Sequence, residues 1–358
     1  MGAARKYLLS GLVLCAAAGV ILCPAELSAA VRNSVSGCLE VVIPALFAFT
    51  VISIYMQRSG LYLTAFAPLT KPLSRLLRLP EELCAVYLLA NIGGYPVGAR
   101  LLSELVKSGR LSKKDAGRML CCCYGSGPSF VIGTAGTEVF RSAGAGGVIY
   151  AACLVSSLVV ALVVCRAGER ITLSSGENRL DLSADCFVRS VDSGARVMYT
   201  VCAMATAFAG ITALLERSGI TRAVSWLLEI AGFGGNADRV FPAFLEVTRV
   251  RGMLPDGVLA APLCAGLLSF GGICVIMQVM AVSGGLVPVR GLLISRIPAA
   301  LLSAALAFPV KFLPDAAQEV YSANAASVEA FSVNAGLSVC VMIMAAILII
   351  SVSRMTSE

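Results

Sequence analysis

The stretch AGGVIYAACLVSSLVVALVVC, residues 145–165, runs for 21 residues without a charged side chain. An α-helix rises about 1.5 Å per residue, so a stretch of this length crosses the hydrocarbon core of a bilayer, which is about 30 Å thick. Seven further stretches of spanning length carry few or no charges: 7–23, 38–56, 119–137, 197–215, 257–282, 291–310 and 331–353. The sequence predicts an all-α polytopic membrane protein with about eight transmembrane helices.

The composition supports this fold class and excludes several kinds of enzyme. Apolar residues make up 58% of the 358 residues, charged residues 14%, and the mean hydropathy is +0.86. A soluble domain of this size has no interior large enough for so many apolar side chains. The chain contains no histidine, which excludes Ser-His and Cys-His catalytic pairs and histidine-ligated zinc.

We therefore expect no enzyme, no metal and no cofactor. Intramembrane hydrolysis through Ser126 or a cysteine lacks a base, because the lysines of the chain fall in predicted loops. The 14 cysteines include no CxxC pair, and most lie singly in apolar runs, where they act as small packing residues. The exception is the run Cys121-Cys122-Cys123, for which a metal or redox role is the alternative.

The distribution of positive charge predicts the orientation. Eight crossings place both termini on one side, and with cytoplasmic termini 20 of the 28 lysines and arginines fall in cytoplasmic segments, as the positive-inside rule requires. The net charge of +7 then reflects orientation and contact with membrane lipids, and no nucleic-acid partner is expected. Residues 1–30 are predicted to form an N-terminal transmembrane helix, and cleavage as a signal peptide after Ser28-Ala29-Ala30 is the alternative.

The chain divides into two similar halves. Ser59-Gly60-Leu61 follows the first span of one half, and Ser218-Gly219-Ile220 follows the first span of the other. Because these two spans are predicted to cross in opposite directions, we expect inverted repeats. The predicted parts after residue 30 are a first repeat (31–165), a cytoplasmic linker (166–196), a second repeat with its following helix (197–310), and an external loop with a C-terminal transmembrane helix (311–358).

Each repeat contains short apolar segments interrupted by glycine or proline. Segments 83–98 and 240–250 are too short to cross, so we predict two re-entrant hairpins, one from each face. A helix that stops inside the bilayer leaves unpaired backbone groups that must face protein or a polar cavity, and its N-terminal end favours an anion. Inverted repeats with broken helices are typical of secondary transporters. The candidate substrate-binding residues at the breaks are Asn91, Gly94, Tyr95, Ser126, Gly127, Ser129, Glu246, Thr248, Arg249, Ser269, Gly271 and Gln278.

The same residues have a purely structural interpretation, in which glycines permit close helix packing and hydroxyls bond back to their own helices. Glu246 and Arg249 stand three apart in a short apolar segment. They either pair with each other or leave Arg249 or Arg251 to face an anionic substrate. Arg296 is expected to snorkel toward the headgroups. No chain of acidic residues suggests a proton relay, and sodium coordination by carbonyls at the breaks is an open alternative.

Four motifs, in order, resemble one known family: GYPVGARL (94–101), SGPSFVIGT (126–134), LEVT (245–248) and SFGG (269–272). They are similar to those of the sporulation integral membrane protein YlbJ family, also called stage V sporulation protein V. The resemblance covers roughly residues 30–310. That family belongs to the nucleoside-recognition or gate superfamily and is similar in plan to the concentrative nucleoside transporters.

The resemblance implies a role in endospore formation, in the mother-cell-derived outer forespore membrane. There the family is thought to pass dipicolinic acid, a rigid aromatic dianion, toward the developing spore. The alternatives are a non-transporting membrane scaffold or receptor for cortex and envelope assembly, and a transporter of nucleoside-like solutes. A small anionic substrate and membrane lipids are the expected partners, and a homo-oligomer or contacts with other sporulation membrane proteins are compatible with the sequence.

Overall fold

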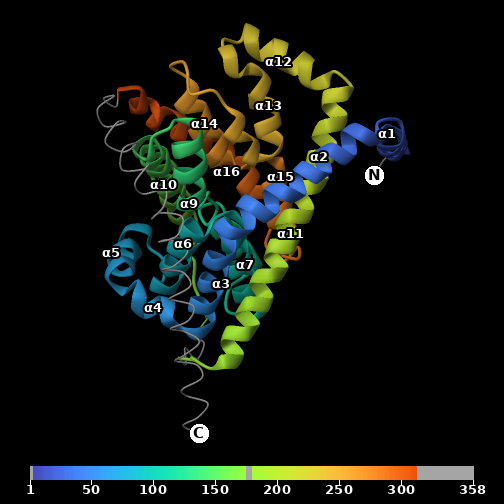
Figure 1. Ribbon diagram of the computed structural model, residues 1–358. Helices are drawn as coiled ribbons and strands as arrows, with labels where there is room; N and C mark the ends of the chain where they lie inside the picture. The colour runs from blue at the N-terminus through green and yellow to red at the C-terminus, as the bar shows by residue number, and fades with distance from the viewer. Residues whose placement is uncertain (1–2, 175–179, 313–358) are drawn as a thin grey trace.

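The computed structural model describes residues 3–174 and 180–312, and every regular element in this part of the chain is a helix (Figure 1). The all-α prediction is confirmed. Four helical segments are long and apolar enough to span a bilayer, as in an integral membrane protein: Ala143–Arg166, Ala184–Arg217, Ala260–Val282 and Arg290–Val310. A fifth candidate is the pair Pro24–Val42 and Leu46–Ser59, whose two helices are bent by 56°.

The first half contains one long uninterrupted helix, α10, and many shorter ones. Two of its elements, η1 and η2, are π-helices. This form is rare in proteins, and where it occurs it is often at a functional site. Its elements are α1 (Ala3–Leu22), α2 (Pro24–Gly37), η1 (Cys38–Val42), α3 (Ile43–Ser59), α4 (Leu61–Ala65), α5 (Ala67–Leu77), α6 (Glu81–Gly93), α7 (Tyr95–Lys107), α8 (Lys113–Leu120), α9 (Pro128–Phe130), η2 (Val131–Val139) and α10 (Ala143–Arg166).

The second half opens with the longest helix, α11, which begins inside the predicted linker. Ser183 fixes this start because its hydroxyl accepts a hydrogen bond from the amide of Cys186 (3.1 Å), as an N-cap does. The elements of this half are α11 (Ala184–Arg217), α12 (Ile220–Ile230), η3 (Gly234–Asn236), α13 (Ala237–Leu245), η4 (Val247–Gly252), α14 (Ala260–Phe270), α15 (Gly272–Val282), α16 (Arg290–Leu306) and η5 (Phe308–Phe312).

The predicted span at 119–137 is wrong. Helix α8 ends at Leu120, and the chain runs without regular helix until Pro128 starts α9. Pro128 cannot continue a helix from the residues before it, and it suits the first helical turn, where no amide donor is needed. The predicted span at 331–353 lies outside the described residues, so the count of eight crossings stays a prediction.

Both predicted hairpin segments are broken helices. Segment 83–98 belongs to α6 and α7, which pack against each other on either side of Gly94, and 240–250 comprises the end of α13 and most of η4. Gly94 adopts φ 91°, ψ 175°, a conformation open to glycine alone. The helical breaks are therefore where the sequence places them, and the re-entrant position of these segments in a bilayer stays a prediction.

The two Ser-Gly motifs have the same local geometry. Gly60 has φ 79°, ψ −3° and Gly219 has φ 80°, ψ −1°, both in the left-handed region that ends helices. The hydroxyl of the preceding serine accepts the amide of the residue after the glycine in each turn, at 3.4 Å for Ser59 and 3.5 Å for Ser218. Each turn ends a long helix and starts a shorter one.

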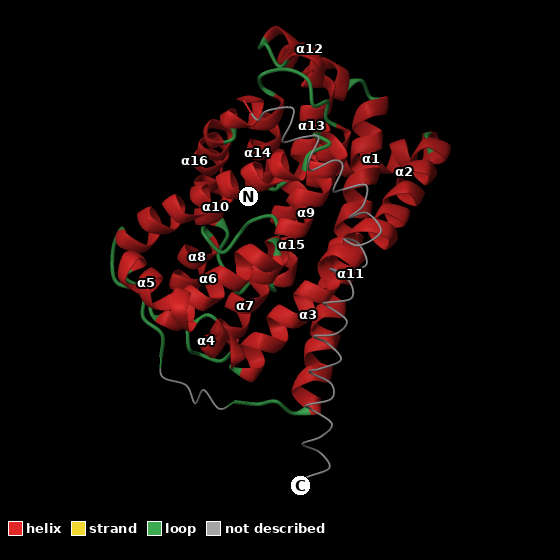
Figure 2. Cartoon of the chain, turned by 60° about the vertical axis from the view of Figure 1, so that its left-hand side comes forward, coloured by secondary structure: helices red, strands yellow, loops and turns green. Residues whose placement is uncertain are grey.

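Helices α3 and α11 pack side by side, and their Ser-Gly turns lie at opposite ends of the molecule. A Cβ atom on Gly194 of α11 would lie 2.7 Å from Cγ2 of Val51 in α3, so glycine permits their close approach. Both views place α4 and α12, which follow the two turns, at opposite ends (Figures 1 and 2). This placement is what an inverted repeat requires.

Helix α12 has no buried residue. Its large apolar side chains Ile220, Trp226, Leu227 and Ile230 are all exposed and recur at helical spacing along one face. Trp226 is the one tryptophan of the chain, and it is 61% exposed. A bare apolar stripe that carries tryptophan is typical of a helix lying at a membrane interface.

Candidate functional site

Four breaks in helices form the centre of the site. They lie at Gly94 between α6 and α7, at Gly127 before α9, at Glu246 between α13 and η4, and at Gly271 between α14 and α15. Glu246 is extended, with φ −141° and ψ 111°, whereas Gly271 is left-handed, with φ 85°. Each break exposes backbone groups that have no partner within their own helices.

Within each half, the two breaks touch backbone to backbone. A Cβ atom on Gly94 would lie 3.6 Å from the amide nitrogen of Gly127. In the second half, a Cβ atom on Gly272 would lie 3.2 Å from the amide nitrogen of Val247 and 3.3 Å from the carbonyl oxygen of Leu245. The glycines at matched places in the two halves therefore serve the same purpose, which is to let one break approach the other.

Two tyrosines join the breaks of the first half to the break at Gly271. The hydroxyl of Tyr95 donates to the carbonyl oxygen of Leu268, and that of Tyr124 donates to the carbonyl oxygen of Phe270 at 2.9 Å. The two rings lie 5.0 Å apart between centroids. A Cβ atom on Gly271 would lie 2.1 Å from the Tyr124 hydroxyl. All four breaks thus meet in one place, which we call the junction.

Arg296 of α16 lies in the junction, and the prediction that it snorkels is wrong. Its side chain is buried, with the residue 2% exposed. Nη1 donates to the carbonyl oxygens of Tyr124 and Ser269, both at 3.3 Å, and Nη2 donates to that of Cys121. The guanidinium also lies 4.8 Å from the centroid of the Tyr124 ring. Carbonyls freed by two broken helices hold the side chain inside, so it has no need of the headgroups.

Most of the predicted site residues lie in or beside the junction and are engaged with protein. The amide of Asn91 donates to the carbonyl oxygens of Tyr87 (2.9 Å) and Cys122 (3.3 Å). Gln278 donates to the carbonyl oxygen of Val201 at 3.4 Å. Ser269 contributes its carbonyl, Ser126 is buried, and Ser129 is exposed. For Asn91 and Gln278 the structural interpretation therefore accounts for the amide donors.

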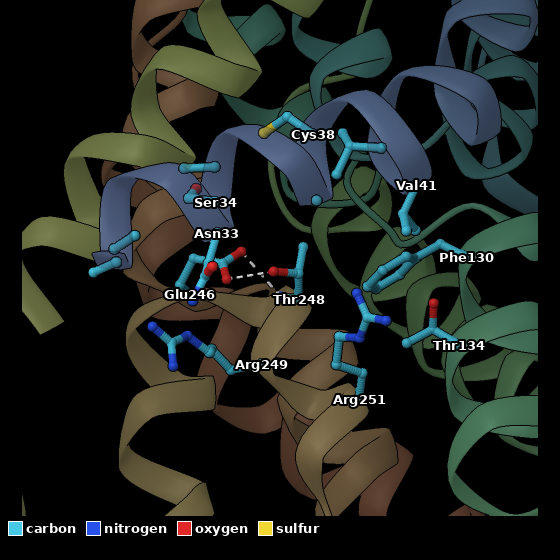
Figure 3. Close-up of a pocket in the computed structure, with 15 residues that line it drawn as sticks. Asn33, Ser34, Cys38, Val41, Phe130, Thr134, Glu246, Thr248, Arg249 and Arg251 are labelled. Atoms are coloured by element: carbon cyan, nitrogen blue, oxygen red, sulfur yellow. Dashed lines mark hydrogen bonds between the residues drawn. The ribbon is translucent and has the colours of Figure 1, made fainter. Parts of the chain in front are cut away.

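A pocket of about 160 Å³ opens beside the Glu246 break (Figure 3). Its walls come from four places in the chain: α2 with η1, α9 with η2, the middle of α11, and the segment from Glu246 to Arg251. Of the predicted residues, Glu246, Thr248 and Arg249 line it. The others that line it with polar side chains are Asn33, Ser34, Cys38, Thr134 and Arg251.

Glu246 caps the helix that follows it. Its carboxylate accepts hydrogen bonds from the amide of Thr248 (3.0 Å) and from the Thr248 hydroxyl. The alternative that Glu246 pairs with Arg249 is met in part: the charge of Arg249 acts on the Glu246 carboxylate, but the described residues show no direct ion pair between them, because Glu246 is extended and stands outside η4. Residue Glu246 is 6% exposed, and its carboxylate is hydrogen-bonded to Thr248.

The two arginines of the pocket differ in their partners. Arg251 forms an ion pair with Glu138 of η2, with 3.4 Å between Nε and Oε2. Arg249 forms no ion pair or side-chain hydrogen bond within residues 3–174 and 180–312. Figure 3 shows Arg249 near Glu246 and Arg251 on the other side of Thr248, next to Phe130 and Thr134. Arg249 interacts with Glu246 through charge alone, so its guanidinium donors are left available to a ligand.

Sequence reasoning missed the wall formed by the N-terminal part of the first repeat. Asn33 and Ser34 lie on α2 and Cys38 on η1, ahead of the apolar run that drew attention. The available signal was an Asn-Ser pair between two apolar segments, a place where polar side chains either meet solvent or line a cavity. Their distance in sequence from Glu246, more than two hundred residues, hid the contact.

Comparison of the chain with family models, with curated proteins and with solved structures finds no match in any of the three. Among the described residues, no group of three or more cysteine, aspartate or glutamate side chains is placed to hold a metal ion. The site consists of a small pocket, lined by the guanidinium of Arg249, beside a junction of broken helices.

Proposed function

We propose that this protein is a secondary transporter or facilitator of a small anion, with the Arg249 pocket as its substrate site. The observation that carries the proposal is the guanidinium of Arg249, which has no direct ion-pair or side-chain hydrogen-bond partner among the described residues, in a pocket whose wall is a broken helix. A half-buried arginine whose donors are not used within the protein attracts a carboxylate, and its planar donors match two carboxylate oxygens. Four broken helices that meet at one point support transport, because such breaks mark the sites of transporters.

Dipicolinate is the substrate that we propose, on the strength of the family resemblance. It is a small, flat, aromatic dianion, and the pocket offers matching chemistry. Arg249 supplies charge, Phe130 supplies an aromatic surface, and Thr134, Asn33 and Ser34 supply polar side chains (Figure 3). The Glu246 carboxylate is satisfied by Thr248, which lessens its competition for Arg249. The proposed place of action is the outer forespore membrane, with both termini in the cytoplasm.

The proposed movement is a displacement of the α2–η1 wall against the Glu246 segment. Helix Pro24–Val42, which ends in η1, and helix Leu46–Ser59 are bent by 56° at residues 43–45, and π-bulges are among the features at which helices kink sharply. The junction, where backbone meets backbone through glycines and Arg296, stays fixed. The pocket would then open to one side or the other as the wall moves.

The test is uptake of labelled dipicolinate by proteoliposomes that contain the purified chain. We expect Arg249→Gln to lower the initial rate at least tenfold, since it removes a charge-assisted contact of about 1.5–3 kcal/mol. Arg290→Gln is the control, because Arg290 is exposed at the start of α16. Absence of any flux of dipicolinate, nucleosides or other small anions through the wild-type protein would contradict the proposal.

A second experiment separates transport from a scaffold role. The gene is placed in a spore-former that lacks its own family member, and the dipicolinate content of the spores is measured. We expect rescue by the wild type and failure of Arg249→Gln at equal protein levels. Rescue by both would favour the scaffold, whereas uptake of nucleosides instead of dipicolinate by the proteoliposomes would favour the nucleoside-like alternative.

A further inference from the structure

Arg296 lies where two helices end. Helix α8 ends at Leu120, and its C-cap residue Cys121 gives its carbonyl to Nη2. Helix α14 ends at Phe270, and Ser269 in its last turn gives its carbonyl to Nη1. A helix C-terminus carries about half an elementary negative charge, because its last carbonyls have no partner within the helix. The guanidinium therefore bridges the negative ends of one helix from each half.

The charge of Arg296 faces these helix ends, and no acid among the described residues pairs with it. Within the described part of the chain the guanidinium forms no ion pair; Nη1 and Nη2 contact backbone carbonyls and the hydroxyl of Ser295, the group lies over the face of Tyr124, and Nε has no hydrogen-bond partner there. A buried charge without compensation is strongly unfavourable. The partial negative charge of the carbonyl oxygens at the two helix ends faces the guanidinium and supplies this compensation in part.

A set of freed carbonyl oxygens at helix ends has a second use in membrane transporters. Unwound carbonyls and half-helix C-termini are the groups that coordinate a coupling sodium ion, and hard cations select oxygen ligands of this kind. Here the carbonyls of Cys121, Tyr124 and Ser269 already face a cation that is part of the chain. A sodium ion cannot enter that place while the guanidinium fills it.

We propose that Arg296 is a built-in substitute for a coupling cation, so that anion movement through this protein is independent of sodium. The proposal rests on the transport function put forward above and adds how that transport is driven. The sodium gradient does not drive the anion, which moves down its own electrochemical gradient. Arg296 acts here as a positioning residue. It holds the end of α8 and the end of α14 together at all times. In a sodium-coupled carrier, the corresponding helix ends would be held together only while sodium is bound.

The first test measures flux. Proteoliposomes take up labelled dipicolinate with an inward gradient of sodium chloride, or of choline chloride at equal ionic strength. We expect wild-type rates that agree within a factor of two, and the same for the control Arg290→Gln. A wild-type rate at least tenfold higher with the sodium gradient would overturn the inference while leaving the proposed transport intact.

The second test needs no flux and asks whether the junction has a cation place. Melting temperatures are measured in detergent for the wild type, Arg296→Gln, Arg296→Lys and Arg290→Gln, in sodium chloride and in choline chloride. We expect Arg296→Gln to melt below the wild type in choline and to gain about 2–4 °C or more in saturating sodium, as a ligand that binds only the folded state produces. The other three should not respond, because their junction retains its own positive charge.

The outcomes of the second test decide the inference even if no solute is transported. Sodium that stabilises the wild type as much as Arg296→Gln would overturn it, and so would an Arg296→Gln protein that folds but ignores sodium. If no flux of any solute is found and the melting pattern is as expected, the transport proposal fails and the assignment of Arg296 stands. The Arg296→Lys variant separates the role of the charge from that of side-chain shape, because lysine keeps the positive charge but differs in shape from arginine. A melting temperature of Arg296→Lys that does not respond to sodium assigns the effect to the charge.

Discussion

At the residue scale, the junction leaves no room for side chains at certain glycines. A Cβ atom on Gly98 of α7 would lie 1.9 Å from the carbonyl oxygen of Cys123, which is backbone and cannot rotate away. Gly147 of α10 is the opposite case, because within residues 3–174 and 180–312 nothing lies within 4 Å of a Cβ atom there. Both are helical glycines with negative φ, so their difference isolates the effect of the close approach.

We expect Gly98→Ala to destabilise the protein by about 1–3 kcal/mol or more, because overpacking forces the 121–127 segment away from α7. Gly147→Ala should be neutral or stabilising by about 0.5–1 kcal/mol, as alanine is the better helix former. Thermal unfolding in detergent measures both. Equal melting temperatures for the two variants would show that the approach at Gly98 is not as close as described.

Thr248 controls how Glu246 presents its charge to the pocket. We expect Thr248→Val to destabilise the protein by about 1–3 kcal/mol, since the buried carboxylate loses its hydroxyl donor. The freed carboxylate then turns to Arg249, so the KM for the anion should rise in uptake assays. Thr248→Ser keeps the hydroxyl and serves as the matched control. A Thr248→Val protein with unchanged stability and KM would argue against this arrangement.

At the scale of elements, the two Ser-Gly turns are matched pieces of backbone. Sequence alone locates both, because glycine after a long apolar run is a strong signal for a left-handed helix end. Their common dihedral angles and serine bonds show that the two halves use one local design. Turns of this kind depend on their own residues, which is why local pattern predicts them well.

The turn at Gly219 offers a clean test, because no atom of the described residues lies within 4 Å of a Cβ placed there. Gly219→Ala should cost about 1–2 kcal/mol through backbone strain alone at φ 80°. Gly219→Asn should cost less, since asparagine tolerates the left-handed region. Chemical or thermal unfolding would reveal the order. Alanine and asparagine variants of equal stability would count against strain as the cause.

At the scale of the whole molecule, sequence predicts the fold class and the breaks but not how distant segments meet. Residues 119–137 are long and apolar enough to predict a transmembrane helix, although Pro128 prevents a continuous helix there. An arginine side chain near a membrane usually extends toward the headgroups, which is what the sequence predicts for Arg296. Its carbonyl partners are at the ends of α8 and α14, which are far apart in the chain. The pocket likewise joins α2 to the Glu246 segment. Such contacts depend on tertiary packing, which composition and periodicity do not encode.

The predicted inversion of the two halves has a direct test in labelling. A membrane-impermeant maleimide is applied to a cysteine-free chain that carries either Lys71→Cys in α5 or Glu229→Cys in α12, both at exposed positions. We expect labelling of Glu229→Cys in intact cells, and of Lys71→Cys only after permeabilisation. Labelling of both from the same side would rule out an inverted arrangement.

The lone tryptophan of the chain makes α12 a spectroscopic probe. Trp226 is exposed on the bare face of that helix and does not line the Arg249 pocket. Its emission should shift to shorter wavelength when detergent is exchanged for bilayer, and lipids brominated near the headgroup should quench it more than those brominated deep in the acyl chain. Filling of the pocket, by contrast, should leave tryptophan fluorescence unchanged. The fluorescence of Trp226 therefore reports contact with lipid. It also serves as an internal control in ligand titrations, because it should not change when the pocket is filled.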